Sequence, residues 1–384
     1  MNKHAIPIGH ATAGVLHVVD TLETGGLERV VSDLAMAQRA AGRPSTVFSL
    51  LATDGFRDEL ERAGVPVVVG DKHGTLDRKV LSRLRATLRE RSIGIIHTHN
   101  FVPNYYAALA ALGLPGKPLL VNTCHNMGTR LARRRLRWLY RASLWRTARV
   151  ALVGAEAREH LVGAGIVPAA RSATVLNGIP VERFGSSGER RAAARRRLQL
   201  ADDDLVLGCV GRLVGLKNHA QLIRCLPRLL PRHPRARLVL IGDGPLSAEL
   251  RAQVDAARLG DRVVMAGAQA NVAELLPAFD VFVLPSLTEG ISIALLEACA
   301  SGLAVVASAV GGNVEIIRDG ENGRLVGLGD DAALEDALDA LLDDGELRAR
   351  LGRAAATWVA SHASIEVMRE AYERFYAEAR CSRK

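Results

Sequence analysis

The sequence predicts an α/β protein with two doubly wound, Rossmann-like parallel-sheet domains that face each other across a cleft. Short apolar runs alternate with amphipathic helical runs along most of the chain, which is typical of a parallel sheet with helical crossovers. A basic and polar stretch over 181–204 interrupts this alternation, and a second series of apolar runs follows it. The 384 residues are enough for two domains of ordinary size.

Apolar runs mark the predicted strands of both domains. They cover 15–22, 45–51, 65–70, 93–100, 118–126, 149–154 and 173–179 in the first half, and 205–213, 236–244, 262–267, 281–286 and 303–310 in the second. Three helical stretches follow Gly329, the last over 364–380. We therefore expect a first domain over 1–180, a linker with a short basic helix over 181–204, a second domain over 205–363, and a final helix and tail over 364–384. The final helix is expected to pack back toward the first domain, and ligands are expected in the cleft at the carboxyl ends of the strands.

The composition indicates a soluble globular protein of a reducing compartment. Hydrophobic residues make up 48% of the chain and charged residues 24%, as in folded rather than disordered proteins. The five cysteines are odd in number and form no C-x-x-C pair, which favours the cytoplasm and neither disulfides nor zinc. The first residues lack the apolar core of a signal peptide, and no run approaches the ~20 apolar residues of a membrane span.

The stretch from Pro285 to Gly302 is the centre of the predicted site. An apolar strand leads into a polar loop with Glu289, and a helix from Ile291 carries Glu297. Two helical turns separate these carboxylates by roughly 12 Å, too far for an acid/base pair on one bond but suitable for two contacts along an extended ligand. The N–H groups of Gly290, Ile291 and Ser292 at the helix start favour an anion. The alternative is that Glu289 caps the helix and Glu297 lies on a solvated face.

Two bases follow the first strand of the second half. Arg212 directly follows the strand, and Lys217 comes five residues later. A guanidinium and an ammonium at the end of a sheet suit a diphosphate, although both could be ordinary surface bases. No G-x-x-x-x-G-K-[ST] motif is present, so the sequence does not support ATP hydrolysis of the P-loop type.

The ordered set GRLVGLKN, LIGDGP, VFVLPSLTEG, LLEACASGLAVVAS and VGGNVEIIRDGENG resembles the C-terminal half of family-4 glycosyltransferases of the GT-B fold. This resemblance implies a nucleotide-sugar donor in the second domain and transfer with retention, without a required metal. By motif match, Arg212 and Lys217 are similar to the family's diphosphate ligands and Glu297 to its ribose ligand. Glu289 would contact the donor sugar, with the amides of Gly290 to Ser292 near the sugar and phosphate.

The first half contains further candidates. Gly25 and Gly26 resemble the family's glycine loop near the donor diphosphate, and an ordinary strand-to-helix turn is the alternative. His125 resembles the histidine beside the donor sugar, so His125 and Glu289 are the candidate catalytic residues; a structural histidine is the alternative. Asn100, in the segment HTHN, and Asn126 are candidates for the acceptor side.

The chain has an excess of basic residues. Its net charge of +9 predicts an anionic partner such as nucleic acid, an anionic membrane surface or a phosphorylated metabolite. The stretch from Thr129 to Arg146 contains seven arginines, no acidic residue, and interleaved leucines and tryptophans. It is an interfacial helix on anionic lipid, a funnel for an acceptor phosphate, or a solvated helix whose apolar stripe packs on its own domain. No nucleic-acid-binding module is present, so we expect no nucleic acid partner.

The function expected from these features is retaining, metal-independent sugar transfer from a nucleotide-diphospho-sugar to a saccharide or lipid-linked acceptor. A UDP- or GDP-sugar is expected as co-substrate, with no cofactor. The basic helix and the resemblance point to cell-surface polysaccharide or glycolipid synthesis in the cytoplasm, with the protein peripheral on the inner face of the membrane. Two alternatives remain: a nucleotide-sugar epimerase, which would convert the donor without an acceptor, and a non-catalytic nucleotide-sugar sensor.

Overall fold

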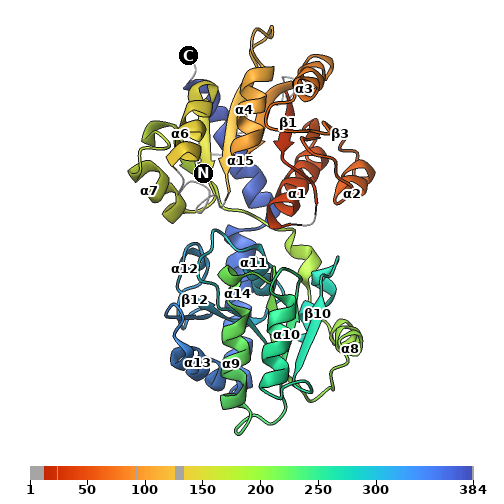
Figure 1. The fold of residues 1–384 in the computed structure, drawn as a ribbon, viewed down its shortest axis with the longest axis vertical. Helices are drawn as coiled ribbons and strands as arrows, with labels where there is room; N and C mark the ends of the chain where they lie inside the picture. Colours follow the sequence, from red (N-terminus) through yellow and green to blue (C-terminus); the bar gives the residue numbers. More distant parts are fainter. Residues whose placement is uncertain (1–12, 24, 92, 126–133, 383–384) are drawn as a thin grey trace, which may run out of the picture. The chain divides into compact units, whose positions relative to one another are not determined.

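The chain folds into two compact units. The computed structural model describes residues 13–382 except 24, 92 and 126–133. The first unit draws on the ranges 1–151, 164–173 and 372–384, and the second on 152–163 and 174–371. Each unit contains a sheet with helices packed on it (Figure 1).

The first unit has a seven-stranded sheet with the order β3-β2-β1-β4-β5-β6-β7. The pairs β3–β2, β2–β1, β1–β4 and β4–β5 are parallel. Its strands are β1 (Gly14–Val19), β2 (Ser45–Ser49), β3 (Val67–Val69), β4 (Ile93–His99), β5 (Leu119–Cys124), β6 (Arg149–Leu152) and β7 (Ser172–Thr174). Its helices include α1 (Gly26–Ala40), α2 (Arg57–Arg62), α3 (Arg78–Glu90), α4 (Phe101–Ala110) and α6 (Arg134–Ser143).

The second unit has a six-stranded sheet with the order β10-β9-β8-β11-β12-β13, and all its pairs are parallel. Its strands are β8 (Leu205–Val210), β9 (Ala236–Ile241), β10 (Val263–Gly267), β11 (Val281–Leu284), β12 (Ala304–Ser308) and β13 (Arg324–Val326). Its helices include α7 (Ala155–Gly163), α8 (Gly188–Arg197), α9 (His219–Leu229), α10 (Ser247–Ala256), α11 (Ile293–Ala300), α12 (Asn313–Ile316), α13 (Asp331–Asp343) and α14 (Gly345–His362). The last helix, α15 (Ile365–Cys381), begins in the second unit and ends in the first.

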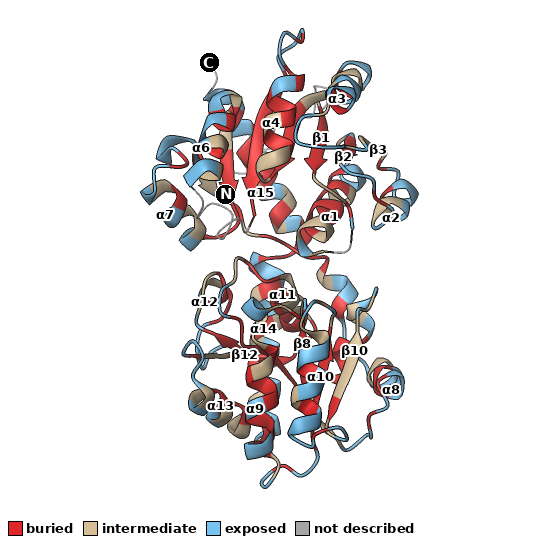
Figure 2. Cartoon of the chain, viewed as in Figure 1, coloured by how far each residue is buried: buried red, intermediate tan, exposed pale blue. Residues whose placement is uncertain are grey.

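Both faces of the second sheet are covered by apolar side chains. Along β8, Val206 and Val210 belong to one core cluster, whereas Leu207 and Cys209 belong to another. Because successive side chains of a strand point to opposite faces, this alternation shows that the sheet is the middle one of three layers. Figure 2 shows the same pattern, with buried strands and with helices that are buried on one side and exposed on the other.

The observed elements confirm the predicted fold class of two Rossmann-like parallel-sheet domains. All twelve predicted strands are present with shorter bounds. The prediction missed β13, because its three residues are too few for an alternating pattern and only Val326 among them is fully buried. The prediction that the final helix reaches the first domain is also confirmed, since Tyr372 and Tyr376 of α15 hydrogen-bond with Thr123 and His97.

One helix is grouped with the second unit although it follows β6 of the first. The backbone N–H groups of Ala155 and Glu156, at the start of α7, donate to the carboxylate of Glu315 at 2.9 and 3.2 Å. A carboxylate at a helix N-terminus satisfies free N–H groups and interacts favourably with the helix dipole. Glu315 therefore fixes α7 to α12 of the second unit.

Candidate functional site

The candidate residues of the second unit lie at the point where its strand order reverses. In the order β10-β9-β8-β11-β12-β13, the chain moves outward in one direction from β8 and in the other from β11. The loop after β8 contains Arg212 and Lys217, and the loop after β11 contains Glu289 to Ser292. Helices leave two such strands in opposite directions, so a crevice opens beside their carboxyl ends, and ligands of open α/β sheets bind there.

The structure brings Lys217 and Glu289 into direct contact. The Nζ atom of Lys217 donates to Oε1 of Glu289 at 2.5 Å, and the hydroxyl of Ser286 donates to the same oxygen at 2.6 Å. The Glu289 side chain is 7% exposed and that of Lys217 is 23% exposed. The other oxygen of Glu289 and the remaining protons of Lys217 are therefore the groups of this pair that a ligand can use.

A pair of glycines holds the backbone of the Glu289 loop. A Cβ atom at Gly311, where φ is +51°, would lie 1.9 Å from the carbonyl oxygen of Glu289. A Cβ atom at Gly312 would lie 2.3 Å from the oxygen of Gly290, and the Gly312 N–H donates to that oxygen at 3.0 Å. Only glycine allows this approach, so the segment VGGN serves to position the Glu289 loop.

The loop leaves a row of N–H groups at the start of α11. The helix begins at Ile293 rather than at the predicted Ile291, because Ser292 is the N-cap and its hydroxyl accepts from the N–H of Leu295 at 3.4 Å. Within the described residues, the N–H groups of Gly290, Ile291 and Ser292 donate no hydrogen bond. Glu297, the fifth helical residue, is half-buried. N–H groups followed by a carboxylate one turn later suit a phosphate and then a hydroxyl-bearing group.

Arg212 and Lys217 both lie in the loop that follows β8. The methylene groups of Lys217 run 3.6–3.7 Å from the position of a Cβ atom on Gly211, next to Arg212. Arg212 is exposed, and its guanidinium makes no hydrogen bond or ion pair with a described residue. Behind Lys217, His219 is buried with both ring nitrogens unpartnered, and burial lowers its pKa to about 4. His219 therefore adds no charge to the two bases at neutral pH.

The candidates of the first unit also lie at a reversal of strand order, here between β1 and β4. Gly25 is the N-cap of α1 and Gly26 its first residue, while Asn100 follows β4 and His125 follows β5. The side-chain oxygen of Asn100 accepts from the N–H of His125 at 2.9 Å. Asn126 lies outside the described residues.

The first turn of α1 contains a carboxyl group that the sequence reasoning did not consider. A Cβ atom at Gly25 would lie 2.2 Å from Oε2 of Glu28, so this side chain folds back over the glycine. Burial raises the pKa of Glu28, with a further contribution from the charge of Asp20. The motif Gly-Gly-x-Glu at a helix start is the signal that could have indicated it.

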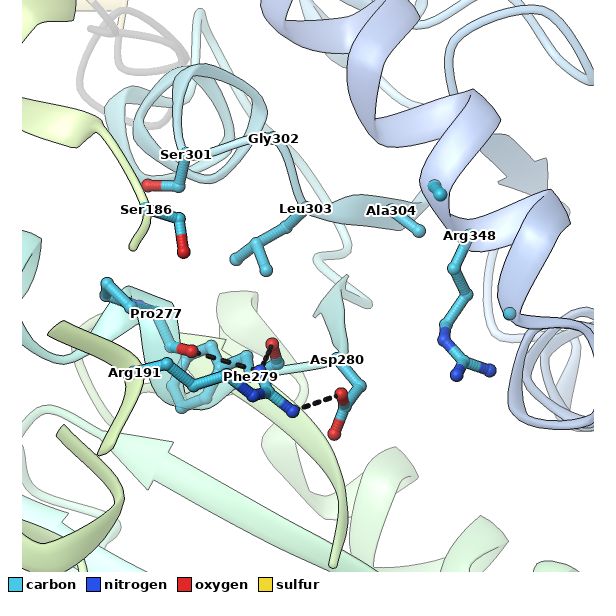
Figure 3. Close-up of a pocket in the computed structure, with 12 residues that line it drawn as sticks. Ser186, Arg191, Pro277, Phe279, Asp280, Ser301, Gly302, Leu303, Ala304 and Arg348 are labelled. Carbon is cyan, nitrogen blue, oxygen red and sulfur yellow. Dashed lines mark hydrogen bonds and ion pairs between the residues drawn. The ribbon is translucent and has the colours of Figure 1, made fainter. Parts of the chain in front are cut away.

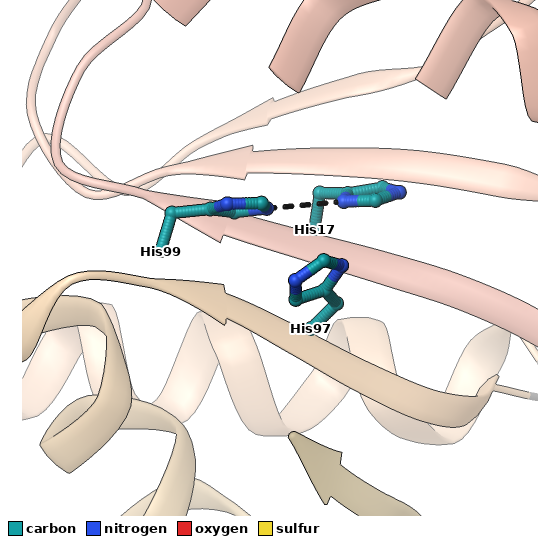
Figure 4. Close-up of side chains that lie close together, drawn as sticks. All are labelled: His17, His97 and His99. Atoms are coloured by element: carbon teal, nitrogen blue, oxygen red, sulfur yellow. Dashed lines mark hydrogen bonds between the residues drawn. The ribbon is translucent and has the colours of Figure 1, made fainter. Parts of the chain in front are cut away.

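Three histidines beside His125 are the main feature that sequence reasoning underestimated. His97 and His99 were included only as part of HTHN, and His17 was not considered. All four rings are buried, and those of His97 and His99 lie 4.2 Å apart (Figure 4). The signal was a polar residue within an apolar strand, at alternate positions in β4 and at the centre of β1.

Three of these rings offer nitrogen atoms within a range that could hold one cation. Suitable atoms of His17, His97 and His99 lie within 4.8 Å of one another. However, both nitrogens of each ring already have hydrogen-bond partners at 2.7–3.2 Å. The cluster is therefore a hydrogen-bonded network, in which a cation would displace existing partners.

A cavity of about 280 Å³ lies near the amino ends of strands β11 and β12 of the second sheet. Its lining includes Asp280 and Leu303, the residues that directly precede these two strands (Figure 3). Its cationic groups are already used within the fold. Arg191 donates to the carbonyl oxygens of Pro277 and Phe279 at 3.1 and 3.0 Å and to Asp280 at 2.6 Å. Arg348 donates to two carbonyl oxygens at the end of α13. The cavity is therefore a packing feature of the fold.

The basic helix is described from Arg134 onward, and Thr129 to Arg133 lie outside the described residues. Tyr140 and Ser143 of α6 are buried, which anchors the helix on its own unit. Trp138 and Trp145, by contrast, are 68% and 59% exposed. Among the helices of the described ranges, none combines the length and apolarity needed to cross a membrane.

Comparisons with known proteins identify the family. The model described as Glycosyltransferase Family 4 matches residues 24–183, and the one described as Glycosyl transferases group 1 matches residues 190–358. A Bacillus subtilis (strain 168) protein called EpsF, assigned as a glycosyltransferase, is 30% identical over 309 residues, which are 77% of this chain and 78% of EpsF. The chain belongs to glycosyltransferase family 4. The resemblance noted in the sequence is thereby confirmed.

Two further relatives extend this result. The glycosyltransferase is 28% identical over 301 residues to the Escherichia coli UDP-Gal:α-D-GlcNAc-diphosphoundecaprenol α-1,3-galactosyltransferase, covering 76% of this chain and 77% of that enzyme. Among solved structures, Anabaena HepE in complex with UDP-glucose aligns with a TM-score of 0.84 at 21% identity, over 95% of this chain and 99% of HepE. These likenesses confirm the GT-B fold and do not favour the epimerase or sensor alternatives.

Proposed function

We propose that this glycosyltransferase moves a sugar from a nucleotide-diphospho-sugar to a saccharide or lipid-linked acceptor, with retention and without a required metal. The contact between Lys217 and Glu289 supports this most directly. In this contact a cation suited to phosphate lies against a carboxylate suited to sugar hydroxyls, beside the strand-order reversal at which ligands of open α/β sheets bind. That is the arrangement required at the bond between a diphosphate and a sugar.

Each candidate residue has a role in this proposal. Arg212 and Lys217 bind the diphosphate, with Gly25 and Gly26 at the same group. The N–H groups of Gly290 to Ser292 lie near the sugar and phosphate. Glu297 holds the ribose hydroxyls, and Glu289 and His125 contact the donor sugar. Asn100 and Asn126 are the proposed acceptor-side residues. The roles of Arg212, Lys217, Glu289 and Glu297 agree with their charges, since cations bind phosphate and carboxylates accept from hydroxyls. Those of Gly25, Gly26 and His125 rest on the resemblance to the family.

The proposed reaction takes place on one face of the donor sugar. The bond between C1 and the phosphate oxygen breaks, and its electron pair leaves with the nucleoside diphosphate. The acceptor hydroxyl oxygen forms the new bond to C1 on the same face, and its proton passes to the leaving phosphate. Arg212 and Lys217 stabilise the negative charge that develops on that phosphate.

The proposed acceptor is lipid-linked and lies at the anionic inner face of a membrane. Exposed tryptophans beside arginines favour an anionic lipid surface, because the rings enter the interface while the guanidinium groups meet phosphates. The relative from Escherichia coli supports the same class, since its name specifies a diphosphate-linked lipid acceptor. Its donor and the ligand of HepE support a UDP-sugar, with a GDP-sugar as the other candidate.

The proposal is tested by thermal shift with UDP-, GDP- and ADP-sugars in the presence of EDTA. A ligand at 100 times its Kd adds about 2.7 kcal/mol to the free energy of unfolding. One nucleotide-sugar should stabilise the protein clearly, and addition of a lipid-linked acceptor should then release the nucleoside diphosphate. NMR of the product should show the anomeric configuration of the donor. Absence of any shift would contradict the donor site, and inversion would contradict retention.

A further inference from the structure

A hydrogen-bonded chain of side chains connects Gln38 with His125 in the first unit. The Nε2 atom of His17 lies 2.8 Å from Oε1 of Gln38, and its Nδ1 lies 3.2 Å from Nε2 of His99. The Nδ1 of His99 lies 3.1 Å from Nε2 of His125. Figure 4 shows the middle of this chain, with the rings of His17 and His99 joined edge to edge.

The three histidines that link Gln38 to the end of this hydrogen-bonded series, His17, His99 and His125, are neutral at physiological pH. Burial lowers the pKa of His17 to about 4 and that of His125 to about 3, and it lowers the pKa of His99 well below its usual range. A neutral imidazole has one N–H group and one lone pair on its two nitrogens. Each ring must therefore donate at one end and accept at the other, so the direction of one hydrogen bond determines the direction of all.

The amide of Gln38 sets this direction. Its oxygen faces His17 and also accepts from the hydroxyl of Ser45 at 3.3 Å, while its NH₂ group donates to the hydroxyl of Tyr376 at 3.2 Å. Tyr376 in turn lies 2.8 Å from Nδ1 of His97. Because the amide oxygen only accepts, His17 must donate from Nε2, and its Nδ1 accepts from His99.

We propose that Gln38, acting through His17 and His99, fixes the tautomer of His125, with the proton on Nε2 and a lone pair on Nδ1. Gln38, His17 and His99 are then positioning residues. Nδ1 of His125 makes no hydrogen bond with a described residue, so it is the ring atom that remains for a ligand. The role of this lone pair, to accept a hydrogen bond from a hydroxyl of the donor sugar, rests on the proposed function.

The tautomers can be read directly in the ligand-free protein. Imidazole ¹⁵N chemical shifts distinguish a protonated ring nitrogen from an unprotonated one, and couplings across N–H···N hydrogen bonds identify the donor. With ¹⁵N-histidine labelling, and with His125 assigned by the signal lost in His125→Gln, we expect the wild-type rings of His17, His99 and His125 all to be protonated on Nε2. A wild-type His125 protonated on Nδ1 would overturn the proposal without any further variant.

A pair of variants tests the part played by Gln38. Gln38→Leu leaves an apolar group beside His17, where a bare lone pair costs less than an unpaired N–H. The chain should then reverse, and the ratio of Nε2–H to Nδ1–H at His125 should fall at least tenfold. Tyr372→Phe is the matched control, because its hydroxyl lies in the same cluster and, among the described residues, hydrogen-bonds with Thr123 alone, at 3.1 Å. An unchanged ratio in Gln38→Leu would overturn the proposal.

Turnover separates this inference from the proposed function. If His125 contacts the donor sugar, Gln38→Leu should lower kcat more than Tyr372→Phe does, with the fold of each variant checked by circular dichroism. A changed tautomer with an unchanged kcat would support the relay and contradict the placement of His125 at the donor sugar. The spectra are recorded without donor, so a failed donor assignment does not affect them.

Discussion

At the scale of single residues, the candidate site depends on a few contacts that determine where charges lie. Lys217 and Glu289 hold each other at 2.5 Å, and Ser286 supports the same carboxylate. The contact of Lys217 with Glu289 joins residues that are 72 positions apart, whereas Ser286 lies in the same loop as Glu289. We expect substitutions of Lys217 and Glu289 to affect ligand binding and turnover more than folding.

Replacing Lys217 or Glu297 by alanine should reduce donor turnover at least tenfold. Each loses one interaction with the leaving diphosphate or the ribose, and a tenfold loss corresponds to about 1.4 kcal/mol. Initial rates of nucleoside diphosphate release measure this effect. Lys79→Ala and Glu249→Ala, on exposed helix positions, are the matched controls and should retain wild-type rates. Wild-type turnover in Lys217→Ala or Glu297→Ala would contradict the donor-site assignment.

Replacing Gly311 by alanine should disturb the Glu289 loop. Gly311 and Gly329 both have positive φ, but only Gly311 would place a Cβ atom against another backbone, at 1.9 Å from the Glu289 oxygen. We expect Gly329→Ala to cost about 1–2 kcal/mol of stability through its backbone conformation. Gly311→Ala should cost about 1–3 kcal/mol more and also lower turnover. Urea titrations measure the unfolding free energies of the two variants, and activity assays measure their turnover rates. If both quantities are equal in the two variants, Gly311 does not have this role.

At the scale of elements, charged side chains attach helices to the second unit in two different ways. Arg224 and Arg228 of α9, and Arg232 just after it, pair with acidic residues of α13 at similar intervals, and these pairs are largely exposed. By contrast, Asp280 accepts from Arg191 and Arg195 of α8 and from the N–H of Val206, which fixes α8 to the sheet. The extent to which each kind of ion pair is buried decides how much it contributes to the free energy of unfolding.

Arg195→Ala should destabilise the protein far more than Arg228→Ala. The Arg195 side chain is 2% exposed and that of Arg228 is 70% exposed. Loss of Arg195 removes one of the two cationic partners of the buried Asp280 carboxylate, at a cost of about 3–5 kcal/mol. An exposed pair is worth at most about 1 kcal/mol and is screened by salt. Urea unfolding at low and high ionic strength measures both effects. Similar losses in the two variants would contradict this account.

The segment 134–146 should bind anionic vesicles through its exposed tryptophans, Trp138 in α6 and Trp145 directly after it. Trp138→Ala and Trp145→Ala should each weaken binding to phosphatidylglycerol vesicles in co-sedimentation, with little effect on phosphatidylcholine vesicles, because both rings and charges contribute. Leu328→Ala is the control, since Leu328 is an apolar residue that is also 58% exposed. If the wild-type protein does not bind anionic vesicles, the segment 134–146 is not a membrane contact.

At the scale of the whole molecule, both units follow one plan. Each has a parallel sheet in which the order reverses between its first and fourth strands, and each has its candidate residues in loops beside that reversal. The chain nevertheless crosses between units more than once, since 152–163 and 174–371 belong to the second and 372–384 to the first. Stability at the level of the chain therefore reflects both cores, including the buried histidines.

Stability should fall as pH decreases below about 6.5, the ordinary pKa of histidine. Burial lowers the pKa of His17 to about 4, of His125 to about 3 and of His219 to about 4, so the unfolded chain binds more protons in this window. Each unit of lowered pKa corresponds to about 1.4 kcal/mol, present in full above pH 6.5 and lost as the pH falls toward the folded values. Urea unfolding at pH 7.5, 6.5 and 5.5 measures the trend. A flat or rising stability over this range would contradict it.

Much of the fold could be predicted from the sequence because its signals are local. Strands buried on both faces appear as continuous apolar runs, and the turns between them contain glycine and polar residues, so the alternation is visible without any contact. The motif around Glu289 and Glu297 was recognisable for the same reason, as it lies within one strand, loop and helix. Strand β13 was missed because three residues, of which only Val326 is buried, produce no such pattern.

Local patterns along the chain were enough to predict the α/β class, the two sheets, the family, and the segments in which Arg212, Lys217, Glu289 and Glu297 lie. The tertiary structure decided the contact of Lys217 with Glu289, the support of that loop by Gly311, and the chain from Gln38 to His125. The physical reason is the range of each interaction. Periodicity is a property of neighbouring residues, whereas hydrogen bonds between loops depend on strand order and register, which bring residues from distant parts of the chain to one edge of a sheet.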